Sequence, residues 1–156
     1  MSLIEVRLIG LPVPLHAQVS EQSAEVMREF SHLAATADAE HVPARLIALD
    51  QVMQERFGAF TVASTAELEE AVATGRPHID LAFQVPSEVG GAAREVADIW
   101  DEVDQYCSEG DYLLALKSPP SAVSYRQWLL GEFTRQAAGA QPLSWPDWER
   151  QRSLET

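Results

Sequence analysis

The stretch from Ser87 to Gly110 constrains the fold of this chain more than any other. Its apolar residues recur at steps of three and four, which places them on one side of an α-helix. Ser87 can cap the start of this helix, because its hydroxyl can accept from an amide of the first turn, and Gly110 can close it in the left-handed conformation. Extended apolar segments flank the stretch on both sides, so we expect this helix to lie across a sheet. The residues of the apolar side are Val89, Ala92, Ala93, Val96, Ile99, Trp100, Val103, Tyr106 and Cys107.

Three segments are predicted to be strands. Residues 4–8 and 79–85 alternate polar and apolar side chains, with the period of a half-buried strand. We expect Gly10 with Pro12 to end the first and Pro86 to end the second, since proline cannot donate to a ladder. Residues 112–116 form a short apolar run and are taken as the third strand. A strand, a crossover helix and a strand favour parallel pairing with a right-handed connection, so we expect the second and third strands to lie side by side.

Three helices are expected between the first two strands, at 20–38, 43–58 and 64–75. Ser20 is the expected cap of the first. Gly58 is the expected stop of the second. The third is predicted from a capping box, in which Ser64 and a glutamate three residues later satisfy each other's backbone amides.

A last helix follows Pro120 and ends at Gly139. Its apolar residues cover more than half of its circumference, which predicts burial on two sides. Together these elements predict a single α+β or α/β domain over residues 1–140, with a small sheet of about three strands packed by four to five helices in the order βαααβαβα. Residues 141–156 are expected to be a tail without periodicity that packs back on the domain.

The charge of the chain limits the partners it can have. Its 156 residues carry a net charge of −13, which repels phosphate backbones and anionic lipid, so we expect neither nucleic acid nor a membrane as a partner. The acidity either keeps the protein soluble or meets a basic partner surface. A single cysteine, Cys107, fits a reducing compartment. No run of residues looks like a signal peptide or is long enough to span a bilayer, and we expect the protein to be cytoplasmic.

The chain lacks the GxSxG, GxxxxGK[ST], GxGxxG and HExxH motifs. We therefore expect no cofactor and lean away from an enzyme, although an enzyme with an unfamiliar site stays open. Cys107 lies near the C-terminal end of its helix among carboxylates, which oppose thiolate formation, so we interpret it as a packing residue.

Two polar clusters contain residue types that can bind a metal ion, but we predict no metal site at either. Asp98, Asp101 and Glu102 lie three and four residues apart and share one helical face. They could bind a hard cation, but they also fit a solvated face or a surface for a partner. The other cluster comprises His32, Asp38, Glu40 and His41. Its residues could suit a transition metal, but a polar turn explains them equally well.

Arg126 falls inside the apolar side of the last helix, where an unpaired charge is costly. It either forms a structural salt bridge with a neighbouring element or binds an anion in a pocket at the sheet edge. Lys117 is placed just before the same helix, where ligands gather in open α/β sheets. Trp145 and Trp148, in the tail, either cover apolar surface of the domain or offer aromatic anchors to a partner.

Several segments together resemble a family of small uncharacterised actinobacterial proteins: IEVRLIGLPV, MREFSHLA, VPARLIALDQVMQERFG and SPPSAVSYRQWLLGEFTRQAAGAQPLSW. Members of this family are often encoded near partner-switching regulators, namely STAS-type antagonists, anti-sigma kinases and PP2C-type phosphatases. The resemblance implies a regulatory role and defines no functional residues.

Two functional hypotheses result. The first is a non-enzymatic regulatory or protein-interaction module of the bacterial cytoplasm, with a protein partner that contacts the acidic helix face or the tryptophans of the tail. The alternative is a sensor of a small anionic molecule, or an enzyme, with a pocket near Lys117 and Arg126. The sequence leaves open whether the chain forms a homodimer.

Overall fold

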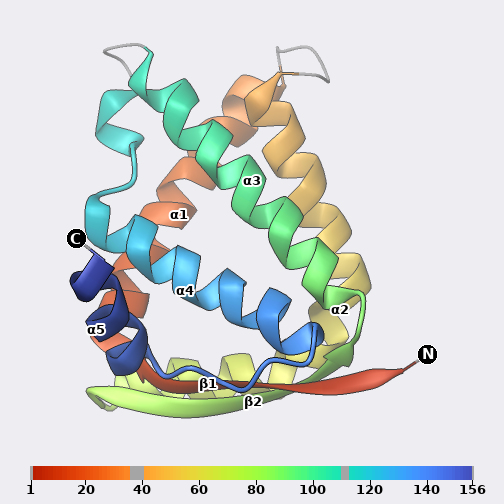
Figure 1. Ribbon diagram of the computed structural model, residues 1–156. Coiled ribbons are helices and arrows are strands. Elements are labelled where there is room, and N and C mark those ends of the chain that lie inside the picture. Colours follow the sequence, from red (N-terminus) through yellow and green to blue (C-terminus); the bar gives the residue numbers. More distant parts are fainter. Residues whose placement is uncertain (1, 36–40, 110–112, 156) are drawn as a thin grey trace.

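The computed structural model describes residues 2–35, 41–109 and 113–155 (Figure 1). The fold is α+β: a two-stranded antiparallel sheet lies at one end, and helices pack on one of its faces. The elements in chain order are β1 (Leu3–Pro12), α1 (Val13–Ala34), α2 (Val42–Ala73), β2 (His78–Pro86), α3 (Val89–Ser108), the short 3-10 helix η1 (Leu114–Leu116), α4 (Pro120–Ala137) and α5 (Trp145–Glu155).

The sheet confirms two predicted strands and corrects the third. β1 and β2 pair with Val6 opposite Phe83 and Leu8 opposite Leu81, and their alternate residues face the core. The expected strand at 112–116 is wrong, because Leu114–Leu116 form η1; Tyr112 lies outside the described residues. The parallel, crossover arrangement is therefore also wrong. β2 takes its partner from the distant start of the chain, and antiparallel strands need no crossover helix.

The junction of β1 and α1 also differs from the prediction. β1 passes through a bulge between Leu8 and Leu11 and continues to Pro12. Gly10 adopts the left-handed conformation there, with φ of 67°, and its amide donates to the carboxylate of Asp80 at 2.8 Å. α1 then begins at Val13 rather than at Ser20. Proline suits the first turn of a helix, where its missing amide costs nothing, and Pro14 occupies that turn.

α2 is one continuous helix where two were expected. Gly58 lies inside it, and Ser64 is a buried residue of its inner face rather than a cap. Phe57, Ser64 and Ala71 recur at steps of seven and are all buried against the rest of the fold. Packing along this face outweighs the local stop and start signals, since a glycine inside a helix costs only about 1 kcal/mol. Gly75 does follow the end of the helix, with φ of 71°.

α3 has the predicted amphipathic character. Val89, Ile99, Trp100 and Val103 are among its buried residues. It begins at Val89, after Glu88, and no side chain caps it, so the expected Ser87 cap is wrong. Gly110 lies outside the described residues.

α4 is buried on two sides, as predicted, because it packs against α3, β1 and α1. α3 and α4 approach closely at Gly90, where a Cβ atom would lie 2.7 Å from the Cβ of Ala137. Thr134 adds a hydrogen bond from its hydroxyl to the carbonyl of Gly90, at 3.0 Å. The absence of a side chain at Gly90 therefore lets the two helices cross at short range.

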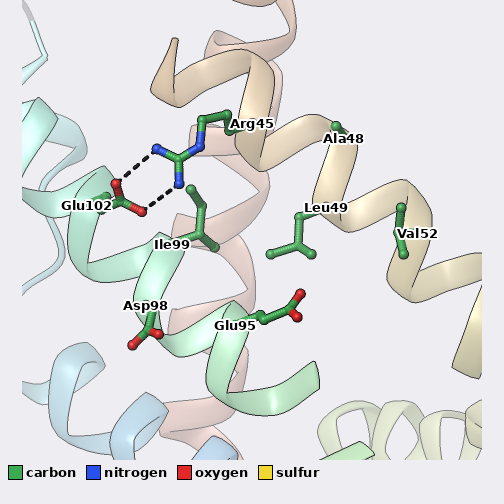
Figure 2. A pocket seen from close by; sticks show the side chains of 8 residues that line it. All are labelled: Arg45, Ala48, Leu49, Val52, Glu95, Asp98, Ile99 and Glu102. Atoms are coloured by element: carbon green, nitrogen blue, oxygen red, sulfur yellow. Dashed lines mark hydrogen bonds and ion pairs between the residues drawn. The ribbon is translucent and has the colours of Figure 1, made fainter. Parts of the chain in front are cut away.

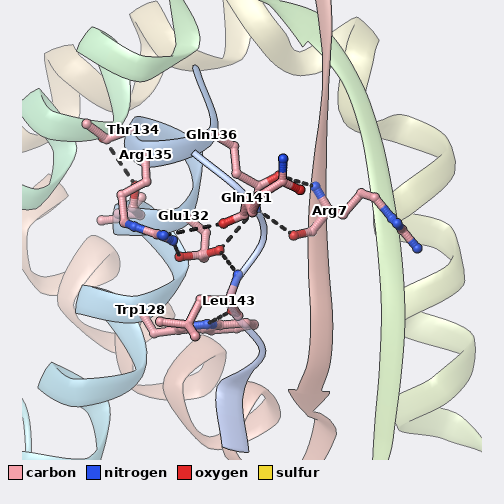
Figure 3. Close-up of polar contacts among 9 residues, drawn as sticks. Arg7, Trp128, Glu132, Thr134, Arg135, Gln136, Gln141 and Leu143 are labelled. Atoms are coloured by element: carbon pink, nitrogen blue, oxygen red, sulfur yellow. Dashed lines mark hydrogen bonds and ion pairs between the residues drawn. The ribbon is translucent and has the colours of Figure 1, made fainter. Parts of the chain in front are cut away.

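Both edges of the sheet are covered at the same pair of residues. Arg7 and Ala82 lie opposite each other in the register. On the β1 edge, the side-chain amide of Gln136 accepts from the amide of Arg7 and donates to its carbonyl, both at 2.8 Å (Figure 3). On the β2 edge, the hydroxyl of Ser64 donates to the carbonyl of Ala82 at 2.9 Å.

The tail contains a helix, α5, where no periodic structure was expected. The segment before it is held by α4 (Figure 3). Glu132, only 1% exposed, accepts from the amide of Leu143 at 2.8 Å and also pairs with Arg135. The indole of Trp128 donates to the carbonyl of Leu143 at 2.9 Å. These contacts place Trp145, two residues further along the chain, in the main core, at 8% exposure.

Candidate functional site

A cleft of about 540 Å³ lies between α2 and α3 (Figure 2). Ile99 at its floor is buried, Leu49 is half-buried and Val52 is 41% exposed. The cleft therefore presents apolar surface that the fold leaves accessible. All of its lining residues come from these two helices: Arg45, Ala48, Leu49, Val52, Glu95, Asp98, Ile99 and Glu102.

Acidic side chains dominate the rim of this cleft. At one end, Arg45 donates to both carboxylate oxygens of Glu102 at 2.9 Å (Figure 2). These hydrogen bonds lower the pKa of the Glu102 carboxyl. Neither Glu95 nor Asp98 forms an ion pair in the part of the chain that the structure describes. With Arg45 and Glu102 balancing each other, the rim keeps a net negative charge.

The structure separates the three predicted acidic residues of α3. Asp98 and Glu102 line the cleft, whereas Asp101 does not, and its charge acts on Arg126 of α4 instead. Within the described ranges, no group of three or more His, Cys, Asp or Glu residues could hold a metal ion. Of the second predicted cluster, Asp38 and Glu40 lie outside the described residues, and His41 packs edge-on against the ring of Tyr106.

Arg126 is 9% exposed and is held by three groups. It donates to the carboxylate of Asp104 at 3.4 Å and to the hydroxyl of Ser118 at 2.8 Å, and its guanidinium lies over the ring of Trp100 at 4.6 Å. Burial lowers the pKa of Arg126, and the charge of Asp104 opposes that shift. Arg126 therefore forms the structural salt bridge that was one of its two interpretations.

Arg126 also lines a second cavity, of about 400 Å³, between α1, α3 and α4. Lys117 is exposed and is not among the lining residues, so the structure does not bring these two cations into one pocket. The lining is mostly apolar: His16, Val19, Ser20, Ser23, Ala24, Met27, Val96, Trp100, Tyr125, Arg126, Leu129 and Leu130.

Three of these lining residues form a hydrogen-bonded row that sequence reasoning missed. Nδ1 of His16 lies 2.8 Å from the hydroxyl of Tyr125, and Nε2 lies 3.1 Å from the hydroxyl of Ser20. Burial lowers the pKa of His16 and raises that of Tyr125. The spacing of four between His16 and Ser20 was a usable signal for a pair on one helix face. Tyr125 had no such signal, because it lies 109 positions away along the chain.

The two tail tryptophans stack on each other, with ring centroids 5.4 Å apart. Trp145 packs edge-on against Trp128 and lies in the core. Trp148 is half-buried and stacks on Trp145, and the guanidinium of Arg152 lies over the Trp148 ring, 5.1 Å from its centroid. Of these two tryptophans, Trp145 is therefore buried and Trp148 is partly accessible to solvent.

Cys107 is fully buried, and burial raises the pKa of its thiol to about 11, with Asp104 adding to the shift. Its environment is that of a packing residue. No helix among the described residues has the length and apolarity that a membrane span requires.

Comparison with protein-family models, with curated proteins and with solved structures found no match. The resemblance of the sequence to small actinobacterial proteins stays a prediction.

Proposed function

We propose that this protein is a non-enzymatic regulatory interaction module of the bacterial cytoplasm, and that its α2–α3 cleft receives a basic amphipathic helix of a partner protein. The observation that carries this proposal is accessible apolar surface of Leu49 and Val52 above the buried Ile99. It lies beside the carboxylates of Glu95 and Asp98, which form no ion pair within the described residues. An amphipathic helix binds such a groove by inserting apolar residues at steps of three and four.

Charge supports this choice of occupant. The chain has a net charge of −13, so lysines and arginines flanking the apolar anchors of a partner would be steered toward the cleft and matched by its rim. A second copy of this chain is a poor occupant, because a two-fold interface would set the same acidic rim against itself. The resemblance to proteins encoded beside partner-switching regulators points to a regulatory protein of that kind as the partner.

The first experiment compares two labelled peptides of equal composition, made of leucine and lysine. In one peptide the leucines lie on a single helical face, and in the other their order is scrambled. Fluorescence anisotropy should show that the amphipathic peptide binds about tenfold more tightly, because only it can fill the apolar floor. Equal affinity of both peptides would contradict the proposal, since net charge alone would then explain binding.

Matched variants locate the binding site. Val52→Asp places a charge on the floor of the cleft, whereas Val62→Asp changes a valine of α2 that is 66% exposed and does not line it. Asp98→Lys removes rim charge, and Glu55→Lys makes the same change on exposed α2 surface outside the cleft. Only Val52→Asp and Asp98→Lys should lower the affinity for the amphipathic peptide. A dimer in sedimentation that Val52→Asp dissociates would overturn the proposal in favour of a second copy.

A further inference from the structure

The cavity between α1, α3 and α4 has the properties of a small-molecule site and is separate from the α2–α3 cleft. Its volume of about 400 Å³ falls in the range of ligand pockets, roughly 300–1,000 Å³. None of the described residues lines both this cavity and the cleft. Apolar side chains such as Val19, Met27 and Leu129 supply most of the wall, and a few polar groups converge on it, which is the composition typical of ligand pockets.

The row of Tyr125, His16 and Ser20 supplies a hydrogen-bond donor to this cavity. A neutral imidazole has one N–H and one acceptor nitrogen. If Nδ1 of His16 carries the hydrogen and donates to Tyr125, then Ser20 donates to Nε2 and the hydroxyl hydrogen of Tyr125 is not used within the row. In the other tautomer the hydrogen of Ser20 is the one left over. In either case the row leaves one hydroxyl hydrogen that can be donated to a ligand.

The cavity offers no net charge. Among the described residues, its lining includes no Asp or Glu, although the chain has 24 acidic residues. Arg126 is the only arginine or lysine among its described lining residues, and the carboxylate of Asp104, which is not one of them, already balances it. Burial lowers the pKa of His16 and so favours its neutral form. An anion would find no free countercharge among these lining residues, and removing an unpaired charge even partly from water is costly.

We infer that this cavity binds a small, uncharged, largely apolar molecule that carries a hydrogen-bond acceptor, such as a ketone or an ester carbonyl. The apolar wall takes the carbon skeleton, and the hydroxyl of Tyr125 or Ser20 donates to the carbonyl oxygen. The site is a different one from the cleft in the proposed function, and it can be tested independently of any protein partner.

The neutral naphthyl ketone prodan is a suitable probe, because its emission shifts to shorter wavelength when it leaves water. We expect saturable binding with that shift. The naphthoate analogue, with a carboxylate in place of the ketone, should bind at least about tenfold more weakly because its charge is unpaired in the cavity. Tighter binding of the naphthoate, or the absence of saturable prodan binding, would overturn the inference.

Variants test where prodan binds and which hydroxyl groups donate a hydrogen bond to it. Ala24→Trp fills the cavity, and Ala59→Trp adds the same side chain to exposed α2 surface outside it; only the first should abolish prodan binding. The double variant Ser20→Ala, Tyr125→Phe should lower the affinity for prodan about fivefold. It should leave the affinity for the analogue of prodan that lacks the carbonyl unchanged. Circular dichroism checks that each variant is folded. Prodan binding that survives Ala24→Trp, or that is insensitive to loss of both hydroxyls, contradicts the inference.

Discussion

Arg126 of α4 donates to the carboxylate of Asp104 of α3 at 3.4 Å, and both side chains are largely removed from water, at 10% and 15% exposure. Such a pair contributes little net stability, because desolvating two charges offsets most of their attraction, but breaking it leaves an uncompensated buried charge. The same carboxylate accepts from the amide of Ser118 at 3.1 Å. The pair therefore fixes how α4 starts relative to α3.

A double-mutant cycle should show this asymmetry. Asp104→Leu alone should lower the free energy of unfolding by about 3 kcal/mol, because Arg126 is left buried and unpaired. Asp104→Leu combined with Arg126→Met should cost less than Asp104→Leu alone, since no unpaired guanidinium remains. Urea unfolding measures all the variants. If the double variant costs the sum of the two single ones, the residues do not interact as the structure describes.

Two glycine-to-alanine substitutions should have opposite effects. At Gly58, inside α2, a Cβ atom would lie 3.4 Å from the side-chain oxygen of Gln54, which that flexible side chain can accommodate. Gly58→Ala should raise the free energy of unfolding by about 0.5–1 kcal/mol, since alanine favours helix. Gly90→Ala should lower it by about 1–3 kcal/mol, because the new methyl would collide with Ala137. Thermal unfolding checks both, and a destabilised Gly58→Ala would indicate that α2 is not continuous there.

The stability of the protein should depend on His16 in mildly acidic solution. Burial lowers the pKa of His16 below its usual value of 6.5, so the unfolded chain binds that proton more readily than the folded one. The free energy of unfolding should therefore fall as the pH drops below 6.5. His16→Gln should flatten this dependence, whereas Gln18→Ala, at an exposed residue of the same helix that carries no titratable group, should leave it unchanged. Equal pH profiles for both variants would contradict the role of His16.

Glu132 should hold the tail on the domain. Glu132→Ala removes the acceptor of the Leu143 amide, so the free energy of unfolding should fall by about 2 kcal/mol and hydrogen exchange at Leu143 should speed up. Glu25→Ala, on exposed α1 surface, is the control. Unchanged exchange at Leu143 would show that other contacts fix the segment.

Cys107 should be unreactive in the folded protein. Its thiol is fully buried and its pKa is raised to about 11, so both access and thiolate content are low at neutral pH. An aromatic disulfide reagent should therefore react only after denaturant unfolds the chain. Rapid reaction without denaturant would contradict the described packing.

Hydrophobic periodicity predicted the elements that bury one clear face. The alternation at 4–8 and 79–85 and the apolar side of α3 were enough to place both strands and that helix. Local boundary signals were less reliable. Gly58 and Ser64 are acceptable stop and start residues, but the inner face of α2 gains more from continuous packing than these signals can oppose.

Pairing between distant segments could not be predicted in the same way. The rule linking a strand, a helix and a strand assumes that sequence neighbours pair, whereas β2 pairs with β1. The sequence marks Arg126 as anomalous within its own helix, but no local pattern identifies its partner Asp104, which lies on another helix. The contact of His16 with Tyr125 depends on the packing of α1 against α4, for which the sequence carries no local signal.

The hydrogen bonds of Gln136 and Ser64 to the two edges of the sheet limit how this protein can associate with other chains. Main-chain groups at the middle of both strands already have side-chain partners, so an incoming polypeptide cannot extend the sheet across its centre without displacing them. This protects the molecule against strand exchange between copies and against fibril growth. Recognition of other molecules is then left to the helices.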